Sequence, residues 1–379
     1  MVMDRSWLLT DWESGLYVES LSLSSAELGI PDARVEKRRL RGGLSDGVDL
    51  IEVAAGELSC TVLPTRGMGL WRASYGDVPL GWQSPVRGPV HPAFVNQAAR
   101  GGMGWLRGFD EWMARCGLES HGAPEEDGDT PLSLHGHIAN LPAQRVAVAA
   151  DPSAGTVTIT GTVHETALFH PKLLLETAVT LGLDSSRITI RDKVTNLGDV
   201  PTEMELLYHT NYGLPFLGEG SRFLIPFEEL TPYHERSAEG LDTYDVYEPP
   251  TPGFVEQVYL FSPAARSGDT ASLAAITNPQ QSGAAVMRFD IRQLPHVAQW
   301  KSTGGASDGY VTGLEPGTSF PNPRSVEREA GRVVTLAVGA SYDVTLMHEV
   351  AVGGEAVDAV AAEVAEIQSG AAGTVNSLP

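Results

Sequence analysis

Residues 208–213 (YHTNYG) contain the side chain best suited to proton transfer near neutral pH. His209 ends a predicted strand that begins with the apolar residues Met204, Leu206 and Leu207. An imidazole has an ordinary pKa close to neutrality, so it can take or give a proton under physiological conditions. The alternative is a core histidine whose ring nitrogens are satisfied by hydrogen bonds within the protein.

Residues 313–317 (GLEPG) place a carboxylate directly after a short apolar strand. Pro316 follows Glu315 and restricts the local backbone, because the proline ring fixes φ. A carboxylate held in this way can act as a general base if its surroundings adjust its pKa. An ordinary glutamate in a surface turn is the alternative.

Two further segments carry side chains that could bind an oxygen-rich ligand. His135 and His137 are two residues apart in 134–140 (LHGHIAN), a spacing that puts both on the same side of a strand. Such a pair could hydrogen-bond to sugar hydroxyls or bind a metal ion. Arg66 lies in a tight turn at 64–69 (PTRGMG), where its planar guanidinium could donate to hydroxyl or carboxylate oxygens. A purely structural role is the alternative for each of these residues.

The elements that must position these side chains are predicted to be β-strands. Apolar and polar residues alternate over 48–53 and 58–63, around a turn at 55–57. From 144 to 212 the same alternation predicts an antiparallel meander of four or five strands, and a second all-β stretch runs from about 271 to 350. We therefore expect an all-β protein, built as one domain from two packed sheets.

Helical patterns are scarce. Residues 92–116 are broken by glycines and predict one or two helical turns, whereas 353–368 have the apolar spacing of a C-terminal helix. Residues 371–379 are expected to form a loose tail. Long loops are predicted at 123–131 and 233–253, and loops on a β scaffold often carry binding sites.

The composition narrows the classes of partner. The chain has 26 basic and 48 acidic residues, a net charge of −22, which disfavours nucleic acids and anionic membrane surfaces. The first residues lack the apolar core of a signal peptide, and no apolar run is long enough to span a membrane. Cys60 and Cys116 are expected to be inert core thiols. These features predict a cytoplasmic protein.

Motifs for common cofactors are also missing from the sequence. There is no glycine-rich phosphate loop between a strand and a helix, no Gly-x-Ser-x-Gly elbow and no Cys/His spacing of the zinc type. We therefore expect neither a metal nor an organic cofactor.

The segments described above, in this order and on an all-β background, resemble the galactose mutarotase-like, or aldose 1-epimerase, superfamily. They are most similar to a divergent bacterial branch whose members mostly lack assigned substrates. The similarity spans roughly residues 45 to 350. It rests on 63–69 (LPTRGMG), 104–109 (GWLRGF), 116–118 (CGL), 134–137 (LHGH) with 140–142 (NLP), 208–213 (YHTNYG), 294–295 (LP), 300–301 (WK) and 310–316 (YVTGLEP).

This resemblance implies one large twisted antiparallel β-sandwich over residues 1–379, the supersandwich of that superfamily, with a cleft on the concave face of one sheet. It implies that His209 and Glu315 are the catalytic pair and that the ligand is a small-molecule carbohydrate. The chain departs from the family where His137 replaces a glycine and where Tyr208 replaces an asparagine. The expected substrate-binding residues are Arg66, His135, His137, Trp105, Trp300, Lys301, Asn211 and Glu256; Asp245, Glu256 and Asp290 are the candidates for the family's binding aspartate.

The expected mechanism transfers two protons on opposite sides of a sugar ring. The Glu315 carboxylate takes the proton of the anomeric hydroxyl while protonated His209 gives one to the ring oxygen, and closure on the other face reverses the roles. With the positive charges of Lys301 and Arg66, the site could bind an anionic sugar as well as a neutral one. The sequence does not set the oligomeric state, and a homo-oligomer is compatible with it.

Two alternatives belong to other classes. The first is a metal-dependent isomerase, epimerase or lyase acting on a keto-sugar, with His135, His137, His209 and Glu315 as ligands. The second is a non-catalytic protein that only binds sugars.

Overall fold

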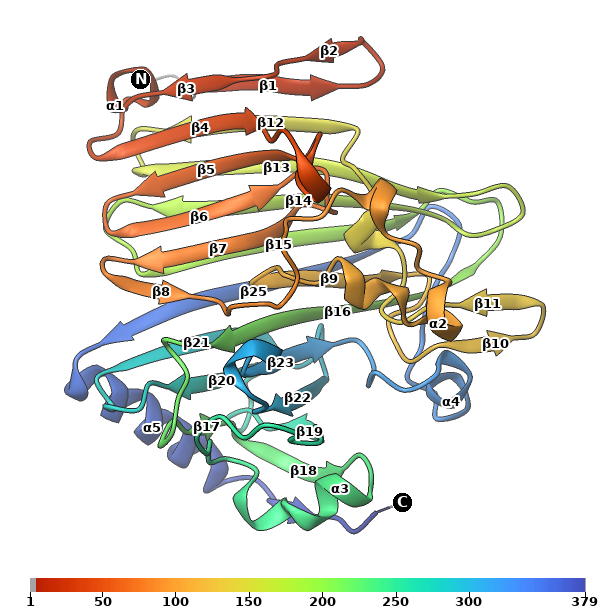
Figure 1. The fold of residues 1–379 in the computed structure, drawn as a ribbon, viewed down its shortest axis with the longest axis vertical. Coiled ribbons are helices and arrows are strands. Elements are labelled where there is room, and N and C mark those ends of the chain that lie inside the picture. The colour runs from red at the N-terminus through yellow and green to blue at the C-terminus, as the bar shows by residue number, and fades with distance from the viewer. Residues whose placement is uncertain (1–4, 379) are drawn as a thin grey trace.

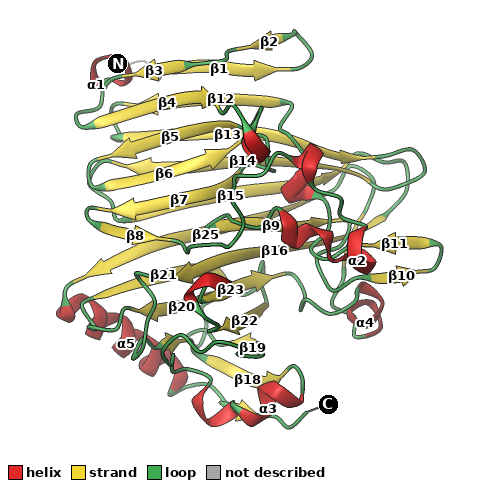
Figure 2. Cartoon of the chain, in the orientation of Figure 1, coloured by secondary structure: helices red, strands yellow, loops and turns green. Residues whose placement is uncertain are grey.

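Two large sheets make up most of the protein, as Figures 1 and 2 show for the computed structural model, which describes residues 5–378. One sheet has 10 strands and the other has 14. Neighbouring strands in both sheets are antiparallel, except for one pair at an edge. The predicted all-β class, with large antiparallel sheets and few helices, is therefore confirmed.

The ten-stranded sheet contains the predicted meander. Its strands, in spatial order, are β17 (Phe223–Leu224), β20 (Ala271–Thr277), β21 (Gly283–Asp290), β25 (Ser341–Val352), β15 (Arg187–Asn196), β14 (Lys172–Gly182), β13 (Thr156–Thr166), β12 (Arg145–Asp151), β1 (Arg5–Asp11) and β2 (Leu16–Tyr17).

The 14-stranded sheet carries the residues predicted to do chemistry. Twelve strands follow one path: β26 (Thr374–Val375), β18 (Phe227–Pro232), β19 (Gln257–Pro263), β22 (His296–Ser302), β23 (Val311–Gly317), β16 (Thr202–Gly213), β9 (Met113–Leu118), β7 (Gly69–Tyr75), β6 (Leu58–Leu63), β5 (Asp49–Ala55), β4 (Ala33–Arg39) and β3 (Leu21–Leu23). Beside that path, β24 (Val334–Leu336) pairs with β16, and β8 (Val78–Leu80) pairs with β7.

The main hydrophobic core lies between the two sheets. It includes Val157 and Ile159 from β13 in one sheet, and Cys60, Val62 and Tyr208 from β6 and β16 in the other. Because side chains alternate along a strand, the residues next to these core positions lie on the opposite, outer face of the 14-stranded sheet. That outer face carries the candidate site.

The meander differs from the prediction at its last strand. Strands β12 to β15 pair in sequence within the ten-stranded sheet, but β16 crosses to the 14-stranded sheet and lies between β9 and β23. Alternation of residues indicates a strand but does not identify its partners. Every residue of β16 from Met204 to Gly213 is buried, because both of its faces are covered.

The largest helix covers part of the ten-stranded sheet. Helix α5 (Gly354–Gln368) confirms the predicted C-terminal helix, and Val357, Val360, Val364 and Ile367 pack against β20, β21 and β25. Figure 1 shows it running along the lower edge of the molecule. The other helices are short: α1 (Ser25–Leu28), α2 (Ala99–Gly102), α3 (Glu235–Glu239) and α4 (Arg324–Glu329), with 3₁₀ turns at Gly43–Ser45, Pro92–Phe94, Met103–Arg107, Ile138–Asn140, Leu241–Thr243 and Ala306–Asp308.

Three segments predicted to be irregular contain regular structure. Residues 123–131 include β10 (Glu125–Asp127), which forms a hairpin with β11 (Thr130–Leu132). Residues 233–253 include α3 and a 3₁₀ turn. In the predicted tail, β26 pairs in parallel with β18, so this segment is anchored by backbone hydrogen bonds rather than loose. Short elements of this kind depend on tertiary neighbours, which the local sequence does not show.

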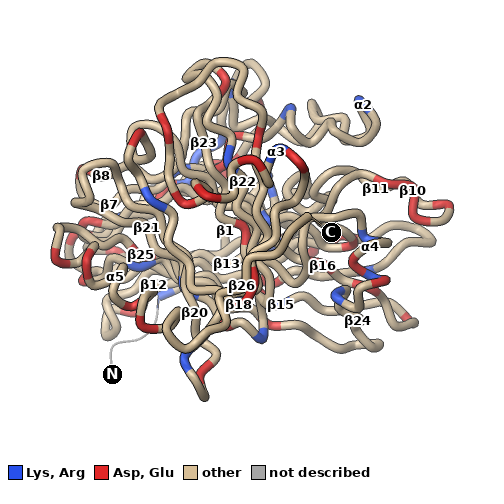
Figure 3. The backbone as a smooth tube through the Cα atoms, turned by 90° about the horizontal axis from the view of Figure 1, so that it is seen from below, with Lys and Arg blue, Asp and Glu red and all other residues tan. Residues whose placement is uncertain are grey.

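Figure 3 shows acidic residues in the β10–β11 hairpin and both acidic and basic residues at the neighbouring α4. There Asp127 accepts hydrogen bonds from Arg324 and Arg328, which lower the pKa of this carboxyl to about 2. These ion pairs attach the hairpin to α4. Within residues 5–378, no helix is long and apolar enough to cross a membrane.

Candidate active site

His209 and Glu315 meet on the outer face of the 14-stranded sheet, on the neighbouring strands β16 and β23. Asn211 pairs with Gly313 in the register between these strands, which places His209 and Glu315 side by side. The distance between His209 Nε2 and Glu315 Oε1 is 3.2 Å. Both residues are almost fully buried, with 4% and 3% of their surface exposed. The predicted convergence of these two side chains is therefore present in the fold.

Gly313 makes this contact sterically possible. A Cβ atom at this position would lie 2.5 Å from Glu315 Oε1 and 2.9 Å from His209 Cε1, closer than real Cβ contacts. The residue type is thus fixed by the two side chains that meet above it, rather than by the backbone conformation of the strand.

Aromatic rings enclose the imidazole of His209. The ring centroid of His209 lies 4.9 Å from Phe109, 5.6 Å from Trp300, 5.3 Å from His135 and 6.0 Å from Trp105. Phe109 and Trp105 come from the long segment between β8 and β9, which runs in front of the sheet in Figure 1. We call these four residues with His209 and Glu315 the His209 cluster. The cluster buries the pair and gives it a largely apolar surrounding.

Burial shifts the pKa values of both His209 and Glu315 away from their ordinary values. Desolvation lowers the pKa of His209 well below its ordinary value, and the nearby His135 contributes in the same direction. Burial raises the pKa of Glu315 to about 8, with a smaller contribution from the charge of Glu256. These shifts favour a neutral imidazole beside a protonated carboxyl at neutral pH, whereas the sequence led us to expect an imidazolium and a carboxylate. The neutral pair and the ionic pair each carry one titratable proton, which the two groups hold between them.

Among residues 5–378, two buried polar atoms of the pair have no partner in hydrogen-bond geometry; the 3.2 Å approach of His209 Nε2 to Glu315 Oε1 is an ion-pair distance that lacks this geometry. The two unpaired atoms are Nδ1 of His209 and Oε1 of Glu315. Buried polar atoms are nearly always hydrogen-bonded in folded proteins, because leaving them unpaired is costly. Unpaired groups at this point of the fold indicate a place where another molecule supplies the partner.

His135 reaches the pair from a turn and not from a strand. Its φ of 59° lies in the left-handed region, and the following 3₁₀ turn begins with His137 as its cap. The prediction that both histidines point to the same side of a strand was therefore wrong. His135 Nδ1 donates to the backbone oxygen of His121 at 3.0 Å, which leaves Nε2 as an acceptor, and burial lowers the His135 pKa to about 4.

His137 lies apart from the His209 cluster. Its Nδ1 is 2.7 Å from the side-chain oxygen of Gln97, and the ring is only partly buried. The four ligands required by the metal-site alternative are thus not brought together. Within residues 5–378, no three His, Cys, Asp or Glu side chains are grouped in a way that could hold a metal ion.

Lys301 lies on the inner side of the sheet, although its neighbour Trp300 belongs to the cluster. Adjacent residues of β22 point to opposite faces, and Lys301 donates to the backbone oxygens of Thr243 at 3.1 Å and Val246 at 2.6 Å. Its ammonium group is thus used within the fold. Lys301, predicted to bind the sugar, is therefore not brought into the His209 cluster.

Arg66 and Asn211 are close to the cluster, but most of their donors are already used. The Arg66 guanidinium binds the Glu111 carboxylate and donates to Val90 O at 2.9 Å, while Nη2 has no partner among residues 5–378. The amide of Asn211 donates to the backbone oxygens of Glu111 and His209, each at 3.1 Å. Arg66 holds the segment before β9 against the turn at residues 64–69, and Asn211 holds the same segment against β16, so the contacts of both side chains are positioning ones.

Glu256 lies at the solvent side of the cluster. Trp300 Nε1 donates to Glu256 Oε2 at 2.7 Å, and Glu256 itself is exposed. Asp290, a second candidate for the binding acid, belongs to the other sheet, where Arg292 pairs with it. Asp245 pairs with Arg222 at 3.1 Å. Of the three candidates, only Glu256 is next to the cluster.

A buried polar network behind His135 was not predicted from the sequence. His121 Nε2 lies 2.8 Å from the Ser319 hydroxyl, which donates to Glu205 Oε1 at 2.8 Å. Because the backbone oxygen of His121 accepts from His135, this network fixes the ring orientation of His135. The three residues are far apart in the chain, so no local motif could have identified them.

Comparison with protein families gives a match over most of the chain. The family described as domain of unknown function DUF4432 matches residues 45–350. No curated protein matches the sequence.

Solved structures include one close neighbour. It is a protein of Klebsiella pneumoniae subsp. pneumoniae MGH 78578, named provisionally as an aldose 1-epimerase, with 35% sequence identity and a TM-score of 0.94 over 99% of this chain and 98% of that one. A galactose mutarotase-like protein from Clostridium acetobutylicum has 14% identity and a TM-score of 0.58, covering 84% and 98%. Galactose 1-epimerase from Lactobacillus acidophilus NCFM has 10% identity and a TM-score of 0.57, covering 85% and 99%. The last two show the shared fold, and together the three confirm the resemblance found in the sequence.

Proposed function

Because the chain belongs to the family described as domain of unknown function DUF4432 and has the fold of galactose mutarotase-like proteins, we propose that it is an aldose 1-epimerase. Such an enzyme interconverts the two anomers of a free sugar. The observation that carries the proposal is the contact of 3.2 Å between a neutral imidazole and a protonated carboxyl, His209 and Glu315, in a water-poor aromatic enclosure.

An adjacent acid and base suit the opening of a hemiacetal. The hydroxyl oxygen to be deprotonated and the ring oxygen to be protonated are both bonded to C1, so two neighbouring groups can reach them. His209 takes the proton of the anomeric hydroxyl, the bond between C1 and the ring oxygen breaks, and Glu315 gives its proton to the ring oxygen. These roles are the reverse of those expected from the sequence.

Ring closure restores the neutral pair. After opening, the substrate is an aldehyde and the pair is an imidazolium beside a carboxylate. Rotation about the C1–C2 bond presents the other face of the aldehyde, Glu315 takes back the proton of the ring oxygen as the bond forms, and His209 returns its proton to the carbonyl oxygen. No net proton is gained or lost, and the ionic intermediate state is stabilised by the short distance between its two charges.

The surrounding residues have separate tasks in this proposal. His135 accepts a hydrogen bond from a sugar hydroxyl through Nε2, since its Nδ1 is committed to His121. Trp300 packs on the apolar face of the ring, and Glu256 binds hydroxyls at the solvent side. Arg66 and Asn211 keep the covering segment in place.

NMR detection of anomer exchange tests the proposal. A panel of aldoses, uronates, deoxy sugars and sulfo sugars is measured with the wild-type protein, with Glu315→Gln and with the exposed control Glu57→Gln. We expect accelerated exchange for at least one sugar, lost in Glu315→Gln by a factor of about 10² to 10⁴ and retained in the control. Sugar binding without faster exchange in the wild type would identify a sugar-binding protein instead and would refute catalysis.

A further inference from the structure

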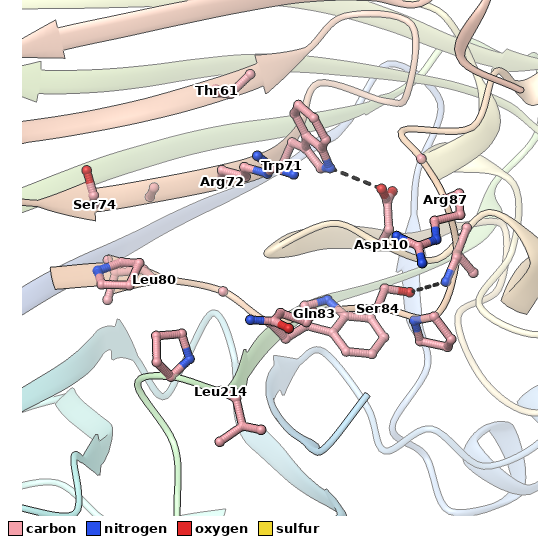
Figure 4. Close-up of a pocket in the computed structure, with 18 of the residues that line it drawn as sticks. Thr61, Trp71, Arg72, Ser74, Leu80, Gln83, Ser84, Arg87, Asp110 and Leu214 are labelled. Atoms are coloured by element: carbon pink, nitrogen blue, oxygen red, sulfur yellow. Dashed lines mark hydrogen bonds between the residues drawn. The ribbon is translucent and has the colours of Figure 1, made fainter. Parts of the chain in front are cut away.

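A groove of about 990 Å³ lies on the same outer face as the catalytic pair and is not used by the mechanism. Its floor is formed by β6 and β7, and the segment 79–88 forms a wall; Figure 4 shows the side chains that line it. Alternation of side chains along β6 places the groove on the outer face of the sheet. Cys60 and Val62 point into the core, whereas Ser59 and Thr61 line the groove. The groove therefore lies on the same face of the sheet as His209 and Glu315, which are themselves buried beneath the His209 cluster.

An irregularity in strand pairing places two large side chains in the groove. The register between β6 and β7 shifts after the pair Thr61–Arg72, since Val62 pairs with Leu70 and leaves Trp71 unpaired. A β-bulge of this kind turns consecutive side chains toward one side of the sheet. Trp71 and Arg72 accordingly both line the groove, and the Arg72 guanidinium lies 4.1 Å from the centroid of the Trp71 ring.

The groove is close to the catalytic pair. Trp82 lines it and also packs on Phe109 at 5.0 Å, and Phe109 packs on His209 at 4.9 Å between ring centroids. The sheet order gives a similar separation. β7 and β16 lie on either side of β9, so two strand spacings, about 10 Å, separate them. A second sugar unit linked to the one at His209 can span this separation.

The groove also offers the free positive charge that the catalytic pocket lacks. Lys301 and Arg66 are committed to internal partners, whereas Arg72 and Arg87 line the groove, are exposed and form no ion pair among residues 5–378. In a chain with net charge −22, two guanidiniums that line one groove and form no ion pair give this groove a local positive charge. Guanidinium groups bind carboxylate and sulfate oxygens through several donors at once.

A buried carboxyl supplies a further polar contact. Asp110 lines the groove, is 8% exposed and accepts a hydrogen bond from Trp71 Nε1 at 3.0 Å. Figure 4 shows this contact beside Arg87. The other oxygen, Oδ1, has no partner among residues 5–378. Burial, with the charge of Glu111, raises the Asp110 pKa to about 7, so its protonated form, which can donate to an anionic ligand, is populated near neutral pH.

We propose that this groove is a second subsite, which binds an acidic sugar unit of a disaccharide whose reducing end occupies the His209 cluster. The inference rests on the proposed function for the position of the reducing end. Trp71 and Trp82 supply flat apolar surfaces for a ring, and Arg72 and Arg87 bind its carboxylate. Because the two units are covalently linked, binding at one subsite raises the effective concentration at the other.

Calorimetric titration tests the subsite with four defined probes: galacturonate, its α-1,4-linked dimer, galactose and α-1,4-linked galactobiose. The proteins are wild type, the double variant Arg72→Gln/Arg87→Gln, and Arg34→Gln, in which an exposed arginine of β4 outside the groove is changed. We expect the galacturonate dimer to bind wild type and Arg34→Gln at least ten-fold more tightly than galacturonate, and the double variant to lose this advantage. Galactobiose should bind wild type and the double variant alike.

Two results would overturn the inference. One is a galacturonate dimer that binds no more tightly than the monomer or fails to bind, and the other is an advantage that persists in the double variant. All titrations are repeated in the Glu315→Gln background, where binding is measured without catalysis. Arginine-dependent binding of the dimer there, with no anomer exchange of any sugar by wild type, would support the subsite while refuting the epimerase. Exchange of monosaccharides without tighter binding of the dimer would support the epimerase and refute the subsite.

Discussion

Replacing Glu315 by glutamine should stabilise the folded protein while removing activity, and the gain in stability should depend on pH. Glutamine has nearly the same shape as the protonated carboxyl, so packing among the surrounding aromatic rings is retained. The difference is that glutamine cannot ionise. In the wild type, the carboxyl has a pKa of about 8 in the folded protein and an ordinary value of 4.5.

The magnitude follows from the two pKa values. A group whose pKa is raised by folding has its full favourable effect below its unfolded pKa, and this effect is lost as the pH rises through the folded pKa. Between pH 5 and pH 8 the unfolded chain releases the proton while the folded protein largely keeps it. At about 1.4 kcal/mol per unit, wild type should lose on the order of 3 kcal/mol of unfolding free energy relative to Glu315→Gln over this interval.

Urea unfolding at pH 5 and pH 8 measures this difference. The expected result is a variant close to wild type at pH 5 and more stable by about 3 kcal/mol at pH 8. The control Glu57→Gln, at an exposed position, should follow wild type at both pH values. A variant that is less stable than wild type at pH 8 would refute the reasoning, because it would mean that Glu315 is held as a carboxylate by an imidazolium.

Three further predictions concern the site and the scaffold. The value of kcat/KM should be level from pH 6 to 7 and fall above about pH 8, as the pair loses its one proton; a maximum above pH 9 in the pH–rate profile would contradict this. Gly313→Ala should lower kcat at least ten-fold, because the added Cβ displaces both catalytic side chains, whereas Gly354→Ala, where nothing lies nearer than 4.0 Å, should leave kcat unchanged; equal kcat values for the two variants would exclude the steric role. Ile367→Ala should lower the unfolding free energy by about 2 to 5 kcal/mol through loss of packing under α5, with unchanged activity per folded molecule, as thermal unfolding and kinetics would show; a loss below about 0.5 kcal/mol, the size of an ordinary surface effect, would mean that α5 does not depend on this contact.

Most strands could be predicted from the sequence because alternation is a local property. The bounds of β5, β6 and the meander strands follow the alternating residues closely, and α5 follows its apolar spacing. The partners of a strand are not local. The crossing of β16 into the 14-stranded sheet brings His209 beside Glu315, and the resemblance to a known family, rather than the alternation, is what indicated that pairing.

The site was predicted in part. His209, Glu315, His135, Trp105 and Trp300 do come together. The position of Lys301 could have been inferred from alternation alone, because it follows Trp300 in the same strand and must point to the other face.

The remaining features depend on tertiary structure. The left-handed turn at His135 needs the surrounding backbone to hold it. The pKa values of the pair follow from burial by Phe109 and Trp105, which come from a distant segment. Desolvation of this kind has no signal in local sequence.

The central claim is that His209 and Glu315 act as one unit that shares a single proton. The most direct test compares anomer exchange, measured by NMR magnetisation transfer, in wild type, His209→Gln, Glu315→Gln and the double variant. We expect each single variant to lose at least about 100-fold in exchange rate and the double variant to lose little more, because either change disables the whole pair. Exchange at the wild-type rate in either single variant, or losses that multiply in the double variant, would contradict it.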